Sequence, residues 1–179
     1  VAGFTDGSLD GSSAGSSDLF VVKYYDNGTK QWTKQLGTSD NDSATGVATD
    51  SSGNVYVTGY TEGSLDGSNA GGNDLFVVKY YDNGTKHWTK QLGTSSNDIA
   101  QGVATDSSGN VYVAGYTNGA LDGTNAGNSD IFVVKYNSSG TKQWTKQLGT
   151  SSGDVANGVA TDSSGNIYVT GNTSGGLDG

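Results

Sequence analysis

The sequence of 179 residues contains no cysteine, proline, methionine or arginine, and only one histidine and one glutamate, His87 and Glu62. Without cysteine there can be no disulfide, thiolate metal site or cysteine nucleophile. Without proline the chain is neither collagen-like nor polyproline, and no strand loses a backbone donor to that residue. One histidine in a single place supports no Ser-His-Asp set, and no G-x-S-x-G elbow occurs. We therefore expect a protein that is not an enzyme.

Positive charge is also scarce, because nine lysines face 18 acidic residues and the formal net charge is −9. A nucleic-acid partner needs a basic stripe, which this chain lacks. No apolar run approaches 18 residues and no signal peptide is visible, so we expect no membrane insertion. An acidic composition rich in Ser, Thr, Gly and Asn suits an extracellular or cell-surface location, which is the localisation we expect.

What the sequence has in abundance is repetition. The phrase "DSSGNVYVTGYT" begins at Asp50 and returns almost unchanged at Asp106 and Asp162, each time 56 residues further on. Residues 1–56 and 57–112 differ at ten positions, so 46 of 56 are identical. We treat residues 1–179 as one repeat region, with units at 1–56, 57–112, 113–168 and a partial unit at 169–179. A period of this length indicates a propeller, a solenoid or an array.

Each unit holds four candidate strands, in which β-branched and aromatic residues stand between Gly, Asn, Asp and Ser. The segment of small residues, Ala44–Asp50, is followed by Asn54–Thr61. The third and fourth strands of each unit are those that first occur as Asp18–Tyr25 and Lys30–Gly37. No apolar series at a spacing of 3.6 residues runs for ten residues, so we expect no helix.

The segments between the strands carry turn signals. "DSSGN" joins the first pair, where Gly53 can adopt a positive φ and Asp50 can accept hydrogen bonds from the turn backbone. Asn27-Gly28 joins the last pair and is the strongest short hairpin signal. Each unit is therefore expected to form a four-stranded antiparallel meander.

The strand "DLFVVKYY" is apolar on both faces, so it needs cover on both sides, which stacked neighbouring sheets would provide. The segment "TGVAT" has small residues and suits the innermost strand, where space is least. We predict an all-β fold made of tandem four-stranded antiparallel blades of a β-propeller.

Three segments, "DSSGNVYVTGYT", "SDLFVVKYYDNGTKQWTKQLGTS" and "NDSATGVATD", together resemble the bacterial SBBP-type β-propeller repeat family. The resemblance extends over the whole chain. It implies a propeller fold and an extracellular or cell-surface setting, and it transfers no catalytic residues. One departure is the long loop "EGSLDGSNAGG", which stands where the family has a shorter, proline-containing segment.

Three units are too few for a closed ring, because propellers use four to eight blades. We expect the chain either to belong to a longer array or to assemble head to tail into a ring or a filament. The expected partners are other copies of the chain or further repeats of the same sequence, with extracellular glycans as a further class.

One candidate binding feature is the tryptophan that recurs between lysines in each unit: Trp32, Trp88 and Trp144. Such a side chain can stack on a sugar ring or hold a cation over its face. Alternatively, it packs between blades with the lysine stems over the ring. In a chain poor in Leu and Ile we favour packing.

The acidic, glycine-rich loops are the other candidate, because Ca²⁺ prefers oxygen ligands and glycine lets carbonyls turn inward. The candidate ligands are Asp10, Asp18, Asp66, Asp74, Asp122 and Asp130. EF-hand spacing is absent, and the same aspartates can simply cap turns and keep the surface soluble. We expect no cofactor unless these loops bind Ca²⁺.

The sequence therefore predicts a non-catalytic structural or adhesive repeat module that can self-assemble, because identical blades present identical surfaces many times. The alternative is a carbohydrate-binding propeller with one site per blade, on the Trp strands or the "LDG" loops.

Overall fold

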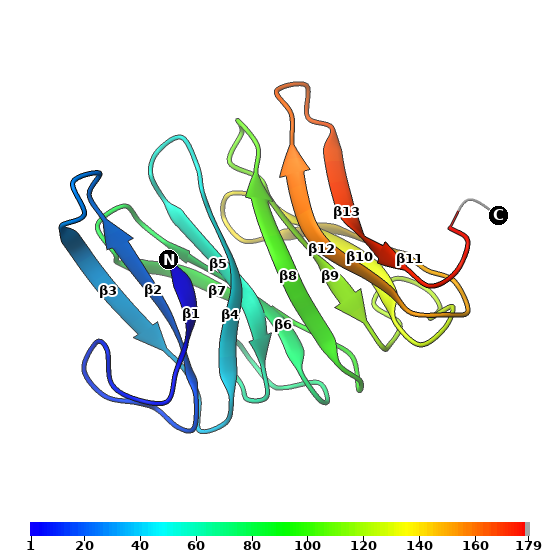
Figure 1. Ribbon diagram of the computed structural model, residues 1–179, viewed down its shortest axis with the longest axis horizontal. Coiled ribbons are helices and arrows are strands. Elements are labelled where there is room, and N and C mark those ends of the chain that lie inside the picture. The colour runs from blue at the N-terminus through cyan, green and yellow to red at the C-terminus, as the bar shows by residue number, and fades with distance from the viewer. Residues whose placement is uncertain (178–179) are drawn as a thin grey trace.

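The computed structural model describes residues 1–177, in which the chain forms strands joined by turns and loops, with no helix (Figure 1). In that range no segment qualifies as a membrane-spanning helix. The strands are β1 (Ala2–Thr5), β2 (Asp18–Tyr24), β3 (Lys30–Leu36), β4 (Asp42–Thr49), β5 (Val55–Thr61), β6 (Asp74–Tyr80), β7 (Lys86–Leu92), β8 (Asp98–Thr105), β9 (Val111–Thr117), β10 (Asp130–Tyr136), β11 (Lys142–Leu148), β12 (Asp154–Thr161) and β13 (Ile167–Thr173).

These strands form four separate antiparallel sheets that stand side by side in a row (Figure 1). Two sheets are complete blades, in the orders β4-β5-β6-β7 and β8-β9-β10-β11. The first sheet has only β1-β2-β3 and the last only β12-β13. The predicted all-β fold of tandem four-stranded blades is confirmed, and the row does not close into a ring.

The turns form as their sequences predict. Between β4 and β5, Gly53 has a φ of 78° and its N–H donates to the carbonyl of Asp50 at 3.0 Å. Between β6 and β7, Gly84 has a φ of 81° and its N–H donates to the carbonyl of Tyr81 at 2.9 Å. Only glycine adopts such backbone angles without strain, so these two positions define the hairpins.

Strand β6 is buried along its whole length, as its two apolar faces require. Leu75 and Val77 on one face belong to the apolar cluster shared with the following blade, whereas Phe76 and Val78 on the other face belong to the cluster shared with the preceding sheet. Fully burying side chains of this size stabilises the fold by about 1.5–3 kcal/mol each. Each blade therefore depends on both of its neighbours for its core.

The small residues of β4, β8 and β12 allow the blades to approach most closely at these strands. A methyl group added at Gly102 would lie 3.2 Å from the Cα of Gly158 in the next blade. A β-bulge in β4 also turns Thr45 toward β8, where its hydroxyl donates to the carbonyl of Ala100 at 2.7 Å. The small-residue strand, which the sequence indicates as the innermost strand, thus lies where adjacent sheets approach each other closely.

A second close approach lies within each sheet, opposite the bulge. A methyl group added at Gly115 in β9 would lie 2.0 Å from the carbonyl oxygen of Ile99 in β8. Backbone occupies that space and cannot move aside as a flexible side chain could. The same contact recurs at Gly59 and Gly171.

We expect Gly115→Ala to destabilise the protein by about 1–3 kcal/mol, because the added methyl overlaps a fixed carbonyl. Gly153→Ala is the matched control, since no atom lies within 4 Å of a methyl group at that position. Urea denaturation followed by tryptophan fluorescence measures both variants. Equal stability of the two variants would contradict this packing account.

Candidate functional site

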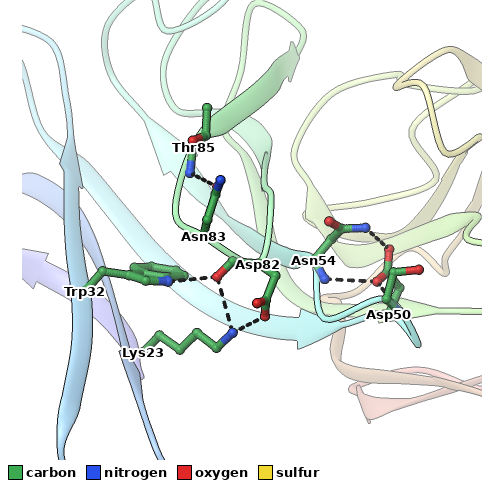
Figure 2. A network of polar contacts seen from close by, with 8 residues as sticks. Lys23, Trp32, Asp50, Asn54, Asp82, Asn83 and Thr85 are labelled. Atoms are coloured by element: carbon green, nitrogen blue, oxygen red, sulfur yellow. Dashed lines mark hydrogen bonds and ion pairs between the residues drawn. The ribbon is translucent and has the colours of Figure 1, made fainter.

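The most elaborate contact of the molecule joins the outer strand of one sheet to a hairpin of the next. In Figure 2 the indole of Trp32, from β3, lies against the β6–β7 hairpin, and its Nε1 donates to the carbonyl of Asp82 at 2.9 Å. Gly84 leaves room for the ring, because a methyl group there would lie 3.0 Å from Trp32 Cδ2. The ring of Tyr80 lies 6.3 Å away, centroid to centroid.

The same contact occurs again one blade further along. Trp88 Nε1 donates to the carbonyl of Ser138 at 3.3 Å, and a methyl group at Gly140 would lie 2.9 Å from the indole. Trp144, the third member of the series, lies 6.2 Å from Tyr112 of its own blade. No hairpin of a following blade covers it within residues 1–177.

Trp32 and Trp88 therefore pack between adjacent sheets. Their indoles lie against a hairpin backbone, so a sugar ring would have to displace that hairpin to stack on them. Among the described residues, Trp144 is the one tryptophan whose indole is not covered by the hairpin of a following sheet.

A lysine accompanies each of these tryptophans from the neighbouring strand. Lys23 forms an ion pair with the Asp82 side chain and also donates to its carbonyl at 3.3 Å (Figure 2). At the equivalent place in the next blade, Lys79 donates to the carbonyl of Ser138 at 3.2 Å, and its ammonium lies 5.2 Å from the centre of the Tyr56 ring. The lysines thus fasten each blade to the next hairpin.

The turn that begins at Asp50 is closed by its carboxylate. One oxygen accepts from the backbone N–H groups of Ser52 at 2.9 Å and Asn54 at 3.0 Å; the other accepts from the side-chain amide of Asn54 at 2.8 Å and the hydroxyl of Tyr56 at 3.0 Å. Burial works against the ionised form, but these donors together outweigh it and hold the pKa of Asp50 below its usual value. Asp106 and Asp162 make the same bonds in the other two turns.

The six aspartates that the sequence indicates as Ca²⁺ ligands fall into two sets. The first set is partly exposed, and each member forms an ion pair with a lysine of the outer strand. These pairs are Asp10 with Lys34 at 3.3 Å, Asp66 with Lys90 at 3.2 Å and Asp122 with Lys146 at 3.5 Å. Partly exposed pairs of this kind contribute little to stability, about 0–1 kcal/mol each.

The second set, Asp18, Asp74 and Asp130, is buried at the start of the central strands. In Asp18 one carboxylate oxygen accepts from the N–H of Ala14 at 2.8 Å and from the side-chain amide of Gln35 at 2.7 Å. Its other oxygen is packed against Gly37, where a methyl group would lie 2.0 Å away. These aspartates therefore close the long loop onto the sheet. Within residues 1–177 no three acidic or histidine side chains gather as a metal-binding group.

A third series of aspartates, which is buried, was not predicted from the sequence. Asp42 is fully buried, and its carboxylate accepts from the backbone N–H of Thr38 at 2.6 Å and from the Thr38 hydroxyl at 2.9 Å. Burial raises the pKa of Asp42 above its usual value, although these bonds oppose the rise. Asp98 and Asp154 repeat the arrangement. The constant spacing T-x-x-x-D in every unit is the signal that could have revealed them.

We expect Trp88→Ala to lower the free energy of unfolding by about 3 kcal/mol, because it removes the packing on Gly140 and the bond to Ser138. Trp144→Ala, the matched control, should cost clearly less at a concentration where the chain is monomeric, since no following hairpin is lost. Thermal unfolding followed by circular dichroism compares the two. Equal losses would contradict the role assigned to the interface.

We also expect the stability lost in Asp106→Asn to depend on pH. The pKa of Asp106 is lowered in the folded chain because burial is outweighed by bonds from Asn110, Tyr112 and Ser108. The ionised carboxylate therefore contributes stability above the unfolded pKa of about 3.9, and this contribution disappears as the pH falls through the lower folded value. Denaturation at pH 7 and at pH 3 should show the variant clearly less stable at pH 7, by about 1–3 kcal/mol, and the gap narrowed at pH 3.

Comparison with known proteins supports the architecture. Three segments match the family described as "Beta-propeller repeat" (SBBP), namely residues 31–66, 87–121 and 143–178. Each match begins in an outer strand and continues through the first two strands of the next blade, so it includes the tryptophan and the Asp50-type turn.

Two curated proteins are more distantly similar. An uncharacterised WD repeat-containing protein of Acanthamoeba polyphaga mimivirus is 28% identical over 168 residues, with 77% of this chain and 12% of that protein aligned. The regulatory protein FlaEY of Caulobacter vibrioides is 27% identical over 167 residues, with 84% of this chain and 18% of that protein aligned. The chain thus spans less than a fifth of either relative.

Proposed function

The chain belongs to the SBBP β-propeller repeat family, and on that premise we propose that it is a non-catalytic structural and adhesive module whose end sheets join further units of the same repeat. The observation that carries the proposal is that each end of the row exposes one half of the contact that joins the blades inside it. The partner we propose is therefore another copy of this repeat, in a ring or a filament.

At the first sheet the exposed half is the hairpin side. Tyr24 is 49% exposed, whereas its equivalents Tyr80 and Tyr136, each covered by the tryptophan of the preceding sheet, are 2% exposed. A methyl group at Gly28 would meet nothing within 4 Å, although at Gly84 it would meet Trp32. The β2–β3 hairpin is therefore equivalent to the hairpins that pack against Trp32 and Trp88, but no tryptophan of the described residues covers it.

At the last sheet the exposed half is the tryptophan side. Trp144 has no following hairpin within the described residues, and Leu148, at the end of the same strand, is exposed. Tyr168 in β13 is 55% exposed, whereas its equivalent Tyr56 is fully buried. Apolar groups of this size are normally covered, so they favour association with a matching surface.

Strand pairing supports the same partner. Inside the row β5 pairs with β4 on one side and β6 on the other, whereas β13 pairs only with β12 within residues 1–177. The free edge of β13 can therefore accept a strand of the β2 type. One complete blade would then contain β12 and β13 from one copy and β2 and β3 from the next, and the four-residue strand β1 would have to leave β2.

The non-catalytic part of the proposal is supported by the single His87, which stacks on Tyr81 at a centroid distance of 4.5 Å in a surface hairpin. The cell-surface location is supported by the family resemblance and the acidic composition. Labelling intact cells with an impermeant reagent tests that location, and protection of the protein from the label would overturn it.

We expect the purified chain to gain mass in steps of 18.2 kDa as its concentration rises, measured by sedimentation velocity. Removing residues 1–5 should lower the concentration required, because it frees β2 for the neighbour's β13. Trp144→Ala should raise it at least about tenfold, since a buried tryptophan at an interface is worth more than about 1.4 kcal/mol.

Electron microscopy of the assembled fraction then separates closed rings from filaments. A chain that remains monomeric at every concentration, both with and without residues 1–5, would overturn the proposal.

A further inference from the structure

One polar cavity of about 230 Å³ lies between the two complete blades, at the end of the molecule where the "DSSGN" turns lie. One wall is the turn Asp50–Asn54 of the first complete blade, and the opposite wall is the turn that contains Ser108 and Gly109 of the second. Lys79 and Ser138 complete the lining. A water molecule occupies about 30 Å³ of liquid, so the cavity has room for a group larger than one water.

Lys79 is the unusual member of this lining. Only 5% of its surface is exposed, and its ammonium forms no ion pair with any carboxylate of residues 1–177. It has the carbonyl of Ser138 at 3.2 Å and the face of the Tyr56 ring at 5.2 Å. Burying an ammonium without a counter-charge is costly, so a negative partner for Lys79 is strongly favoured.

The preceding contact between sheets shows what that partner is. There Lys23, which is equivalent to Lys79, pairs with the carboxylate of Asp82 (Figure 2). The Asp82 carboxylate also lies against the β4–β5 turn of its own blade, because a methyl group at Gly53 would be 2.7 Å from its oxygen. In the following repeat Ser138 replaces Asp82, and the equivalent glycine, Gly109, faces only the Ser138 Cβ, 3.5 Å from a methyl group placed there. The replacement removes a carboxylate and leaves its lysine.

We propose that the cavity beside Lys79 binds a small carboxylate anion, which takes the place that the chain's own Asp82 side chain fills beside Lys23. The one carboxylate in the lining, Asp50, is already engaged by four hydrogen-bond donors from Ser52, Asn54 and Tyr56. These donors hold the Asp50 carboxylate in its own turn, where it forms no ion pair with Lys79.

Acetate is the probe, and it is titrated against the protein at constant ionic strength by replacing chloride. We expect saturable changes in the backbone amide resonances of Ser108, Gly109 and Ser138, with no comparable change at the Lys23 contact, where Asp82 already provides the carboxylate. Glycerol at the same concentrations should leave these resonances unchanged.

Ser138→Asp is the decisive variant, because it restores a carboxylate in the chain at this place. It should weaken acetate binding at least about tenfold, since a tethered group competes at high effective concentration, and it should raise the melting temperature. Lys79→Met should abolish the response to acetate.

Three results would overturn the proposal. They are a response to acetate that does not saturate, a response that Ser138→Asp leaves intact, and an equal response to glycerol. Because Ser138→Asp supplies its own partner for Lys79, the test does not depend on whether Lys79→Met folds.

Discussion

The core of this molecule depends on the sharing of apolar faces between adjacent sheets. A blade such as β4–β7 has no core of its own: Leu75 and Val77 pack toward one neighbour, and Phe76 and Val78 toward the other. The hydrogen bonds within a sheet fix its register, but they do not remove its two faces from water. Stability in such a row is approximately a sum of contacts between nearest neighbours.

The contact between sheets has an apolar part, formed by the central strands, and a polar part, formed where the outer strand meets the next hairpin. The central strands supply the buried aliphatic and aromatic groups, whereas the outer strand supplies an indole that reaches the next hairpin. The lysine beside it adds a directional bond to a carbonyl of that hairpin. Because the hairpin glycine carries no side chain, the indole can approach the backbone closely. The glycine that shapes the turn therefore also forms part of the surface that the tryptophan contacts.

Local features of the fold were predictable from the sequence. The 56-residue period, the turns at Gly53 and Gly84 and the two-sided apolar strand each depend on residues close together in the chain, and all appear in the structure. The ion pair between Lys23 and Asp82 was not predictable, because it joins residues 59 positions apart across two sheets. The buried Asp42 series was also missed, since an aspartate after a Gly-Thr turn is typical of a solvated loop.

The differences between repeats are as informative as their identity. The residues that are identical in all units include those that contact the adjacent sheet. Where Ser138 replaces Asp82, the packing of the tryptophan survives through the backbone carbonyl, but the charge balance of the contact changes. A duplicated blade can thus keep its structural role while a single substitution creates a distinct chemical environment.

A blade owes its stability to its neighbours, and the folding of one blade alone tests this dependence most directly. A peptide spanning residues 42–92 contains all four strands of a complete blade. We predict that its circular dichroism and amide hydrogen exchange are those of an unfolded chain, whereas residues 1–179 unfold cooperatively. A cooperative unfolding transition in the isolated blade would contradict the account.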